Sequence, residues 1–145
     1  MEATWQQILL GVSLASSIVA GVGGVPDLRA PIWQPAPIAF SIWGAIYIGL
    51  AYTVYGVRLH RQSASFAIAL ASALLSSAGW LVSVRMQWYA TSAVLICAAC
   101  GFASAALLTA TRPSAEMSLQ HALLLSVGPG LYAGWLGCAA GLGVN

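Results

Sequence analysis

The sequence predicts an all-α fold, a polytopic membrane protein built as a bundle of five transmembrane helices. Charged residues make up only 6% of the chain and hydrophobic residues 60%, with a mean hydropathy of +0.87. A soluble domain carries roughly 25% charged residues, so this chain is too poor in charge for a soluble fold. The apolar residues also form five separate stretches, each near the roughly 20 residues that a helix needs to cross a bilayer. We expect one transmembrane domain over residues 1–145.

The first apolar stretch predicts a helix over residues 5–22. Glycines and a proline between residues 21 and 26 favour a turn, so the helix should end there. The leader Met-Glu-Ala-Thr carries no positive charge, and no small-x-small cleavage site leads into a soluble domain. We therefore interpret this stretch as a retained transmembrane helix rather than a signal peptide.

The second stretch predicts a helix over residues 37–57. Three prolines between residues 31 and 37 fix φ and favour extended backbone before them, so the helix should not begin before about residue 37. Trp43 and Tyr47 are four residues apart and share one face of this helix. A stiff segment with proline and tryptophan, set before an aromatic helix face, suggests a pocket for a flat apolar ligand. Anchoring at the membrane interface is the alternative.

Three further helices are predicted over residues 64–84, 88–110 and 119–142. The first of these ends at Arg85, and the second ends before the Arg-Pro pair at 112–113. The connection after Arg85 is so short that the two helices it joins must be antiparallel neighbours.

The placement of charge excludes several classes of function. All charged residues lie outside the apolar stretches, and lysine is absent. An intramembrane charge would have indicated ion or proton transport, so a proton-coupled transporter is disfavoured. The net charge of +2 is small and scattered, so we expect no nucleic-acid partner. The sequence contains no Ser/His/Asp set, carboxylate pair or phosphate-binding glycine loop, so we expect no enzyme.

Cysteines and histidines do not predict a metal site. Cys97 and Cys100 form a C-x-x-C inside an apolar stretch, without a second pair or a nearby histidine. We interpret them as small packing residues, with metal or redox chemistry as the alternative. His60 and His121 lie at predicted helix ends, where solvated imidazoles are favoured over haem ligands.

Glycines in the last helix predict a close helix contact. They form two G-x-x-x-G patterns, which allow two backbones to approach in lipid: Gly130 with Gly134 and Gly137 with Gly141. The contact is expected within the bundle, or with a second copy of the chain or another subunit. Pro129 removes one backbone donor and should kink this helix or mark where its ordered part starts.

The entry to the second helix carries the most specific pattern of the chain. It consists of Pro31, Trp33, Pro35, Phe40, Trp43 and Tyr47. This pattern resembles the tryptophan-rich sensory protein family, which includes the translocator protein (peripheral benzodiazepine receptor). The spacing between the loop tryptophan and the helix tryptophan is one residue shorter than in the family, so the chain is similar to a divergent member.

Other segments extend the resemblance with some departures. Trp80 lies where the family has an N-x-x-W pattern, and residues 131–135 are similar to its late tyrosine–tryptophan segment. Ser77 and Gly143 stand where the family has asparagines. The cholesterol-recognition pattern of animal members is absent from the last helix, because no Arg or Lys follows Arg112.

The resemblance implies a membrane protein with a sensory or transport-like role, binding a planar hydrophobic ligand in a tryptophan-lined cavity. The ligand expected is a porphyrin, a haem-like tetrapyrrole or another apolar pigment, and no tightly held cofactor is predicted. Photodegradation of porphyrin, ascribed to some relatives, is an activity that the residues themselves do not suggest. The ligand-binding residues implied are Trp33, Pro35, Phe40, Trp43, Tyr47, Trp80, Tyr132 and Trp135.

A second function from another class stays open, that of a non-catalytic accessory subunit in a larger membrane complex, which could itself hold pigment. The loss of the two asparagines and the glycine-rich last helix favour it. For either function the partners expected are the lipid bilayer, a hydrophobic small molecule, and a second copy or other subunits. The membrane expected is a bacterial inner membrane. Trp5, Trp88 and Tyr89 are expected in the aromatic belt at the membrane interfaces.

Overall fold

The structure is a computed structural model that describes residues 2–22, 41–59, 63–110 and 119–143. These residues form five α-helices and contain no strand, so the predicted all-α class is confirmed. The helices are α1 (Glu2–Val22), α2 (Ile42–Leu59), α3 (Ala64–Arg85), α4 (Tyr89–Ala110) and α5 (Leu119–Gly143).

The helices lie close to their predicted ranges and differ at their ends. α1 begins at Glu2, ahead of the predicted residue 5, and α2 continues to Leu59. α3 starts at the predicted Ala64. The start predicted for the second helix at residue 37 lies outside the described residues.

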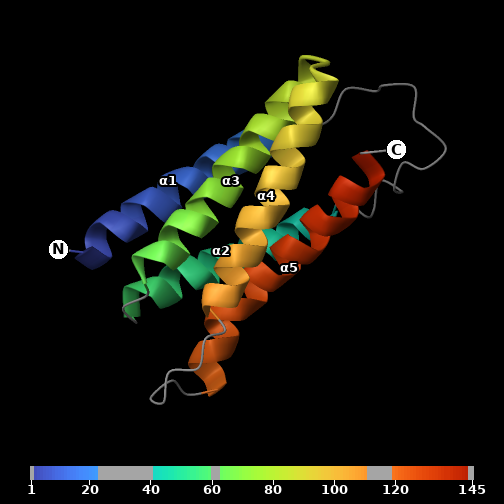
Figure 1. The fold of residues 1–145 in the computed structure, drawn as a ribbon. Helices are drawn as coiled ribbons and strands as arrows, with labels where there is room; N and C mark the ends of the chain where they lie inside the picture. The colour runs from blue at the N-terminus through green and yellow to red at the C-terminus, as the bar shows by residue number, and fades with distance from the viewer. Residues whose placement is uncertain (1, 23–40, 60–62, 111–118, 144–145) are drawn as a thin grey trace.

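The five helices close a ring (Figure 1). α1 packs against α2, α2 against α5, α5 against α4, α4 against α3, and α3 against α1. The antiparallel pairing predicted for α3 and α4 is confirmed, and it is the most extensive helix contact. α1, α3 and α5 run in one direction and α2 and α4 in the other, so three helix C-termini lie at the end that carries the α3–α4 turn. We call this the Arg85 end.

α4 turns a face of small side chains toward the ring. Its buried residues are Ser92, Ile96, Ala99, Ala103, Ala106 and Ala110. Ala99, Ala103 and Ala106 are fully buried, and their spacing of three and four places them on one helix face. Small side chains let helix backbones approach closely, so dispersion contacts hold the pairs where lipid offers no hydrophobic driving force.

A close helix crossing joins α2 to α5 at two glycines. A Cβ atom added to Gly128 would lie 2.5 Å from the Gly49 carbonyl oxygen and 2.7 Å from Thr53 Oγ1. A Cβ atom added to Gly49 would lie 3.0 Å from the Gly128 Cα. The crossing therefore requires glycine at residue 128. The next residue, Pro129, lies inside α5, and the ribbon of α5 bends along its length (Figure 1).

The four glycines predicted to pack helices do not form this crossing. A Cβ atom added to Gly130 would meet only Leu107 Cδ1 at 3.8 Å, and one on Gly137 only Cys100 Sγ at 4.0 Å. Nothing in the described structure lies within 4 Å of such an atom on Gly134 or Gly141. These last two glycines face outward, and their predicted contact with a second subunit stays a prediction.

The α3–α4 turn is a compact helix stop. Gln87 has φ 59°, and the backbone N–H groups of Gln87 and Trp88 donate to the carbonyl oxygens of Val84 and Ser83 at 3.1 and 2.9 Å. This pair of bonds is the Schellman motif, in which glycine usually occupies the left-handed position. Trp88 then accepts the first α4 bond from Ser92 at 2.8 Å, so α4 starts without a linker.

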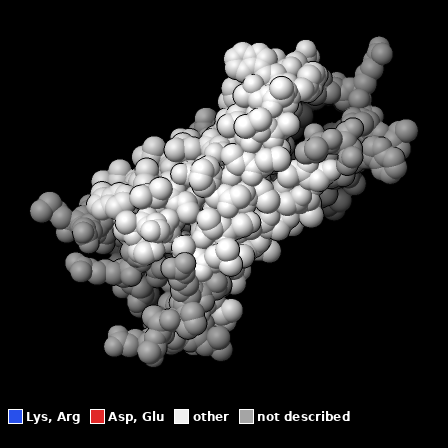
Figure 2. Space-filling view, in the orientation of Figure 1, with Lys and Arg blue, Asp and Glu red and all other residues white. Residues whose placement is uncertain are grey.

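The outer surface of the bundle is apolar. α3 and α4 are each long and apolar enough to cross a membrane, and shorter apolar stretches run over Trp5–Gly21 and Ile42–Val57. Aliphatic side chains such as Val19, Val94 and Leu108 are 68–73% exposed. The face in Figure 2 shows neither blue nor red among the described residues. Such a surface is suited to lipid rather than water.

Candidate functional site

Four aromatic rings from α2 and α5 meet around Trp43. Tyr47 stacks on Trp43 with ring centroids 5.4 Å apart, while Trp135 and Tyr132 meet it edge-on at 6.1 and 6.3 Å. Stacked and edge-to-face pairs at these distances are the geometries that the charge distribution of aromatic rings favours. We call these four residues the Trp43 cluster. Trp43 lies in the first turn of α2, so the cluster belongs to the Arg85 half of the bundle.

The members of the cluster differ in exposure. Trp43, Tyr47 and Trp135 are half-buried, so part of the surface of each residue is accessible. Tyr132 is fully buried, with 0% exposure. Three rings can therefore contact a ligand directly, whereas Tyr132 supports them from behind in this packing.

Hydroxyl groups from three helices meet beneath the aromatic rings. The Tyr132 hydroxyl donates to Ser77 Oγ at 2.6 Å, with the Ala73 carbonyl oxygen as a second acceptor at 3.1 Å. Ser77 donates to the Leu74 carbonyl oxygen at 3.1 Å, and its Oγ lies 3.2 Å from Ser17 Oγ. Ser17, Ser77 and Tyr132 are all fully buried, so this network joins α1, α3 and α5 inside the ring.

The C-terminal part of α1 receives two further hydrogen bonds, one of them in its last turn. The Tyr47 hydroxyl donates to the Ser17 carbonyl oxygen at 3.2 Å, and Arg85 Nη2 donates to the Ala20 carbonyl oxygen at 2.6 Å. The final four carbonyls of a helix have no partner within the helix, and Ala20 is among them. Side chains from α2 and α3 thus hold the end of α1 where it meets the Trp43 cluster.

The remaining predicted site residues fall into two groups. Trp80, on α3, is half-buried against the hydrophobic core of the bundle, and within the described structure it makes no ring contact with the Trp43 cluster. Trp33, Pro35 and Phe40 lie outside the described residues. The structure therefore brings together four of the eight residues that the resemblance implies.

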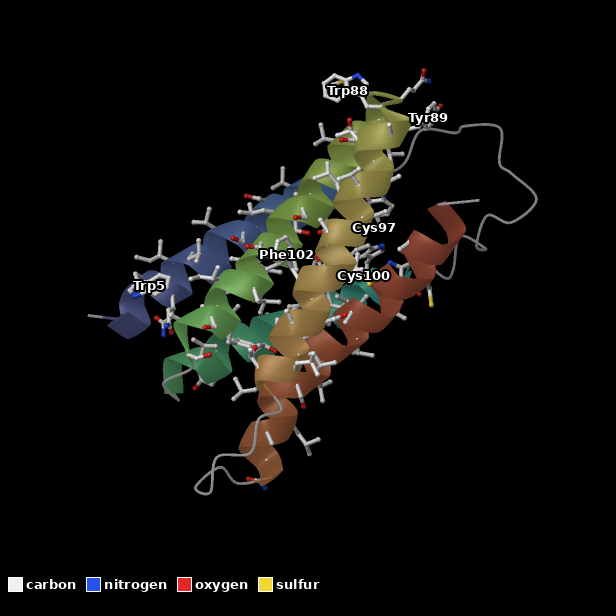
Figure 3. All side chains as sticks on the ribbon, in the orientation of Figure 1. Trp5, Trp88, Tyr89, Cys97, Cys100 and Phe102 are labelled. Carbon is white, nitrogen blue, oxygen red and sulfur yellow. The ribbon has the colours of Figure 1, made fainter. Side chains whose placement is uncertain are left out.

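Aromatic residues away from the cluster mark the two ends of the bundle. Trp88 and Tyr89 project from the α3–α4 turn with 60% and 64% exposure, and Trp5 lies near the opposite end with 40% (Figure 3). Exposed tryptophan and tyrosine at both ends of an apolar bundle is the arrangement of membrane-interface belts.

The cysteines of α4 form no metal centre with the other described residues. Cys97 is exposed, Cys100 is half-buried toward α5, and both are free thiols (Figure 3). Among the residues that the structure describes, no group of three His, Cys, Asp or Glu side chains could hold a metal ion.

Comparison with known families decides what kind of protein this is. The family model described as TSPO-like protein matches residues 7–142. The chain belongs to the TSPO-like family. As a TSPO-like protein it is a member of a five-helix membrane-protein family, so the resemblance to the translocator protein is confirmed in divergent form. Searches of curated proteins and of solved structures returned no match.

Membership gives the Trp43 cluster a functional setting. A TSPO-like protein has a ligand-binding or transport role in a membrane. Of the site residues expected from the sequence, Trp43, Tyr47, Tyr132 and Trp135 lie together in the structure, whereas the hydroxyl of Ser17 and the contact from Arg85 to Ala20 were missed. A serine on a hydrophobic helix and an arginine at a helix end carry no signal of their inward partners.

Proposed function

We propose that this protein binds a flat hydrophobic molecule of the porphyrin or tetrapyrrole class at the Trp43 cluster, in a sensory or transport-like role. The observation that carries the proposal is the set of three half-buried rings held together around Trp43. A ligand with a broad π-face can stack on accessible indole and phenol rings, which supply apolar contact at little cost in side-chain entropy.

Rigid support favours such a site. The Trp43 ring is held edge-on by two rings of α5, and Tyr132 is itself fixed by Ser77. Because these rings are ordered before the ligand arrives, less entropy is lost on binding. We assign Tyr132 a supporting role rather than a direct ligand contact, since its side chain is fully buried.

The proposal is tested by titrating protoporphyrin IX into the purified protein in lipid nanodiscs. The porphyrin absorption band should be followed, because its signal does not depend on how many tryptophans a variant retains. Trp43→Leu should weaken binding by at least about tenfold, the loss of roughly 1.4 kcal/mol. Trp88→Leu is the matched control, because Trp88 is exposed at the α3–α4 turn. Equal affinities for wild type and Trp43→Leu would remove the cluster as the binding site.

A second candidate function is that of a non-catalytic accessory subunit in a larger membrane assembly. The outward face of α5 favours it, because Gly134 and Gly141 have open space around them in the described structure. Such a face admits close approach of another helix, from a second copy or a different subunit. Purification in mild detergent separates the two functions. Stoichiometric co-purification with a larger assembly, without porphyrin binding, would favour the accessory role.

The proposed location is a bacterial inner membrane. The segment at residues 39–47 resembles the prokaryotic and plant branch of the family, which supports this assignment. Fractionation of cells that express the chain should place it with inner-membrane markers, and recovery in another membrane would contradict the location.

A further inference from the structure

The C-terminal ends of α1 and α3 lie together and share one guanidinium group. The two helices run in parallel and pack against each other (Figure 1). Each helix C-terminus carries a partial charge of roughly −0.5, so parallel neighbours bring two like poles together. α1 has no basic residue in its last turn, whereas α3 has Arg85 in its own.

The Arg85 guanidinium interacts with the C-terminal ends of both helices. Its charge lies in the last turn of α3, and its Nη2 donates to the Ala20 carbonyl oxygen of α1 at 2.6 Å. This is a short charge-assisted hydrogen bond, and such bonds are roughly twice as strong as neutral ones. The side chain is only half-exposed, so water weakens the contact less than it would on an open surface.

The C-terminal part of α1 is also bound to the Trp43 cluster. Tyr47 donates to the Ser17 carbonyl oxygen, and its hydroxyl oxygen would lie 3.4 Å from a Cβ atom on Gly21. Tyr47 in turn stacks on Trp43. A continuous series of contacts therefore runs from Arg85 through the end of α1 to the ring on which the ligand is proposed to stack.

We infer that Arg85 is a positioning residue of the ligand site, acting through α1 on Tyr47 and Trp43 without touching the ligand. The predicted effect of Arg85 on ligand affinity rests on the proposed function. The claim that Arg85 fixes the end of α1 is independent of that function. Loss of the guanidinium loosens the C-terminal part of α1, and the Ser17 carbonyl that accepts from the Tyr47 hydroxyl is then held less firmly.

The test compares three substitutions at Arg85 in nanodiscs. Arg85→Lys keeps a cation and its donors, Arg85→Gln keeps a neutral donor, and Arg85→Met keeps only the apolar stem. Arg58→Gln, at the opposite end of α2, is the control for loss of one arginine. Affinity for protoporphyrin IX and hydrogen exchange of the amides in the last turn of α1 are measured for each, well below the unfolding temperature.

We expect the dissociation constant for protoporphyrin IX to rise by at least about fivefold in Arg85→Met and by less in Arg85→Gln. In Arg85→Lys it should stay close to the wild-type value. Exchange in the last turn of α1 should rise in the same order. In a Tyr47→Phe background the effect of Arg85→Gln on affinity should shrink, because the coupling passes through the Tyr47 hydroxyl. A purely structural role would lower the unfolding temperature without this dependence on Tyr47.

The outcomes separate the two proposals. If wild type does not bind protoporphyrin IX, the proposed ligand function fails, and the exchange data still decide whether Arg85 fixes α1. Unchanged exchange in Arg85→Met would overturn the inference, as would a loss of affinity equal to that of Arg58→Gln. Should Arg85→Met not accumulate in the membrane, Arg85→Gln against Arg85→Lys gives the same comparison.

Discussion

Substituting Gly128 by alanine is the sharpest test of how α2 and α5 fit together. The added methyl would lie 2.5 Å from the Gly49 carbonyl oxygen, 2.6 Å from the Gly49 carbonyl carbon and 2.7 Å from Thr53 Oγ1. Two of these atoms belong to the backbone of α2, so no side-chain rotation can clear them. Ordinary contact begins near 3.4 Å, so the helices must separate by about 1 Å or bend locally.

The expected cost follows from two opposing effects. Forcing a methyl into a filled site costs about 1–3 kcal/mol, and a backbone clash belongs at the upper end of that range. Alanine in place of glycine in a helix returns up to about 1 kcal/mol of backbone entropy. The net destabilisation of Gly128→Ala should thus be about 2 kcal/mol. Gly134→Ala makes the same chemical change in the same helix, but the added methyl has no other atom within 4 Å in the described structure. Its effect on the free energy of unfolding should therefore be neutral or stabilising.

Both variants can be unfolded in mixed micelles by titrating SDS, with tryptophan emission as the signal. Near-ultraviolet circular dichroism adds a local measure, because Trp43 and Trp135 lie on opposite sides of the α2–α5 contact. Gly49→Ala should lie between the two variants, since its methyl would approach only to 3.0 Å. Equal stability of Gly128→Ala and Gly134→Ala would refute the steric requirement for glycine at residue 128.

Three further substitutions test separate parts of the fold by the same unfolding assay. Gln87→Gly should stabilise by about 0.5–1 kcal/mol, because glycine adopts φ 59° without strain; destabilisation would contradict this. Ser63→Ala should cost about 1 kcal/mol, because Ser63 Oγ caps α3 at the Phe66 N–H; an unchanged midpoint would rule out the cap. Tyr132→Phe should lower the free energy of unfolding by about 1 kcal/mol, because it removes the hydroxyl that hydrogen-bonds to Ser77. A gain in stability would contradict that bond.

Hydropathy predicted the helices because lipid demands backbone pairing within each segment, so long apolar stretches can only be helical. The α3–α4 pairing followed equally directly from the short turn at Arg85. Trp43 and Tyr47 were predicted as neighbours because a spacing of four places both on one helix face. Contacts within one helix, or across one tight turn, depend only on local geometry.

Contacts between different helices depend on how the helices are rotated against each other, and the spacing of residues along one helix does not reveal that rotation. Gly134 and Gly141 satisfy the G-x-x-x-G pattern, yet the close crossing uses Gly128 and Gly49 from two different helices. The pairing of Ser77 with Tyr132 joins residues 55 positions apart. Ser77 stands where the resemblance expects asparagine, and the structure shows its hydroxyl bonded to Tyr132 and to the backbone of its own helix.

The order of helices around the ring has a consequence for biogenesis. α2 leaves the ribosome before its neighbour α5, and α3 and α4 are made between them. Until α5 is inserted, the Gly49 face of α2 lacks its partner helix, and among the described residues Trp43 has only Tyr47 of its own helix as a ring partner. The two edge-on partners of Trp43 both arrive with α5. The aromatic site is thus assembled only after α5 has been made, so its formation waits for the synthesis of the two helices that lie between α2 and α5 in the chain.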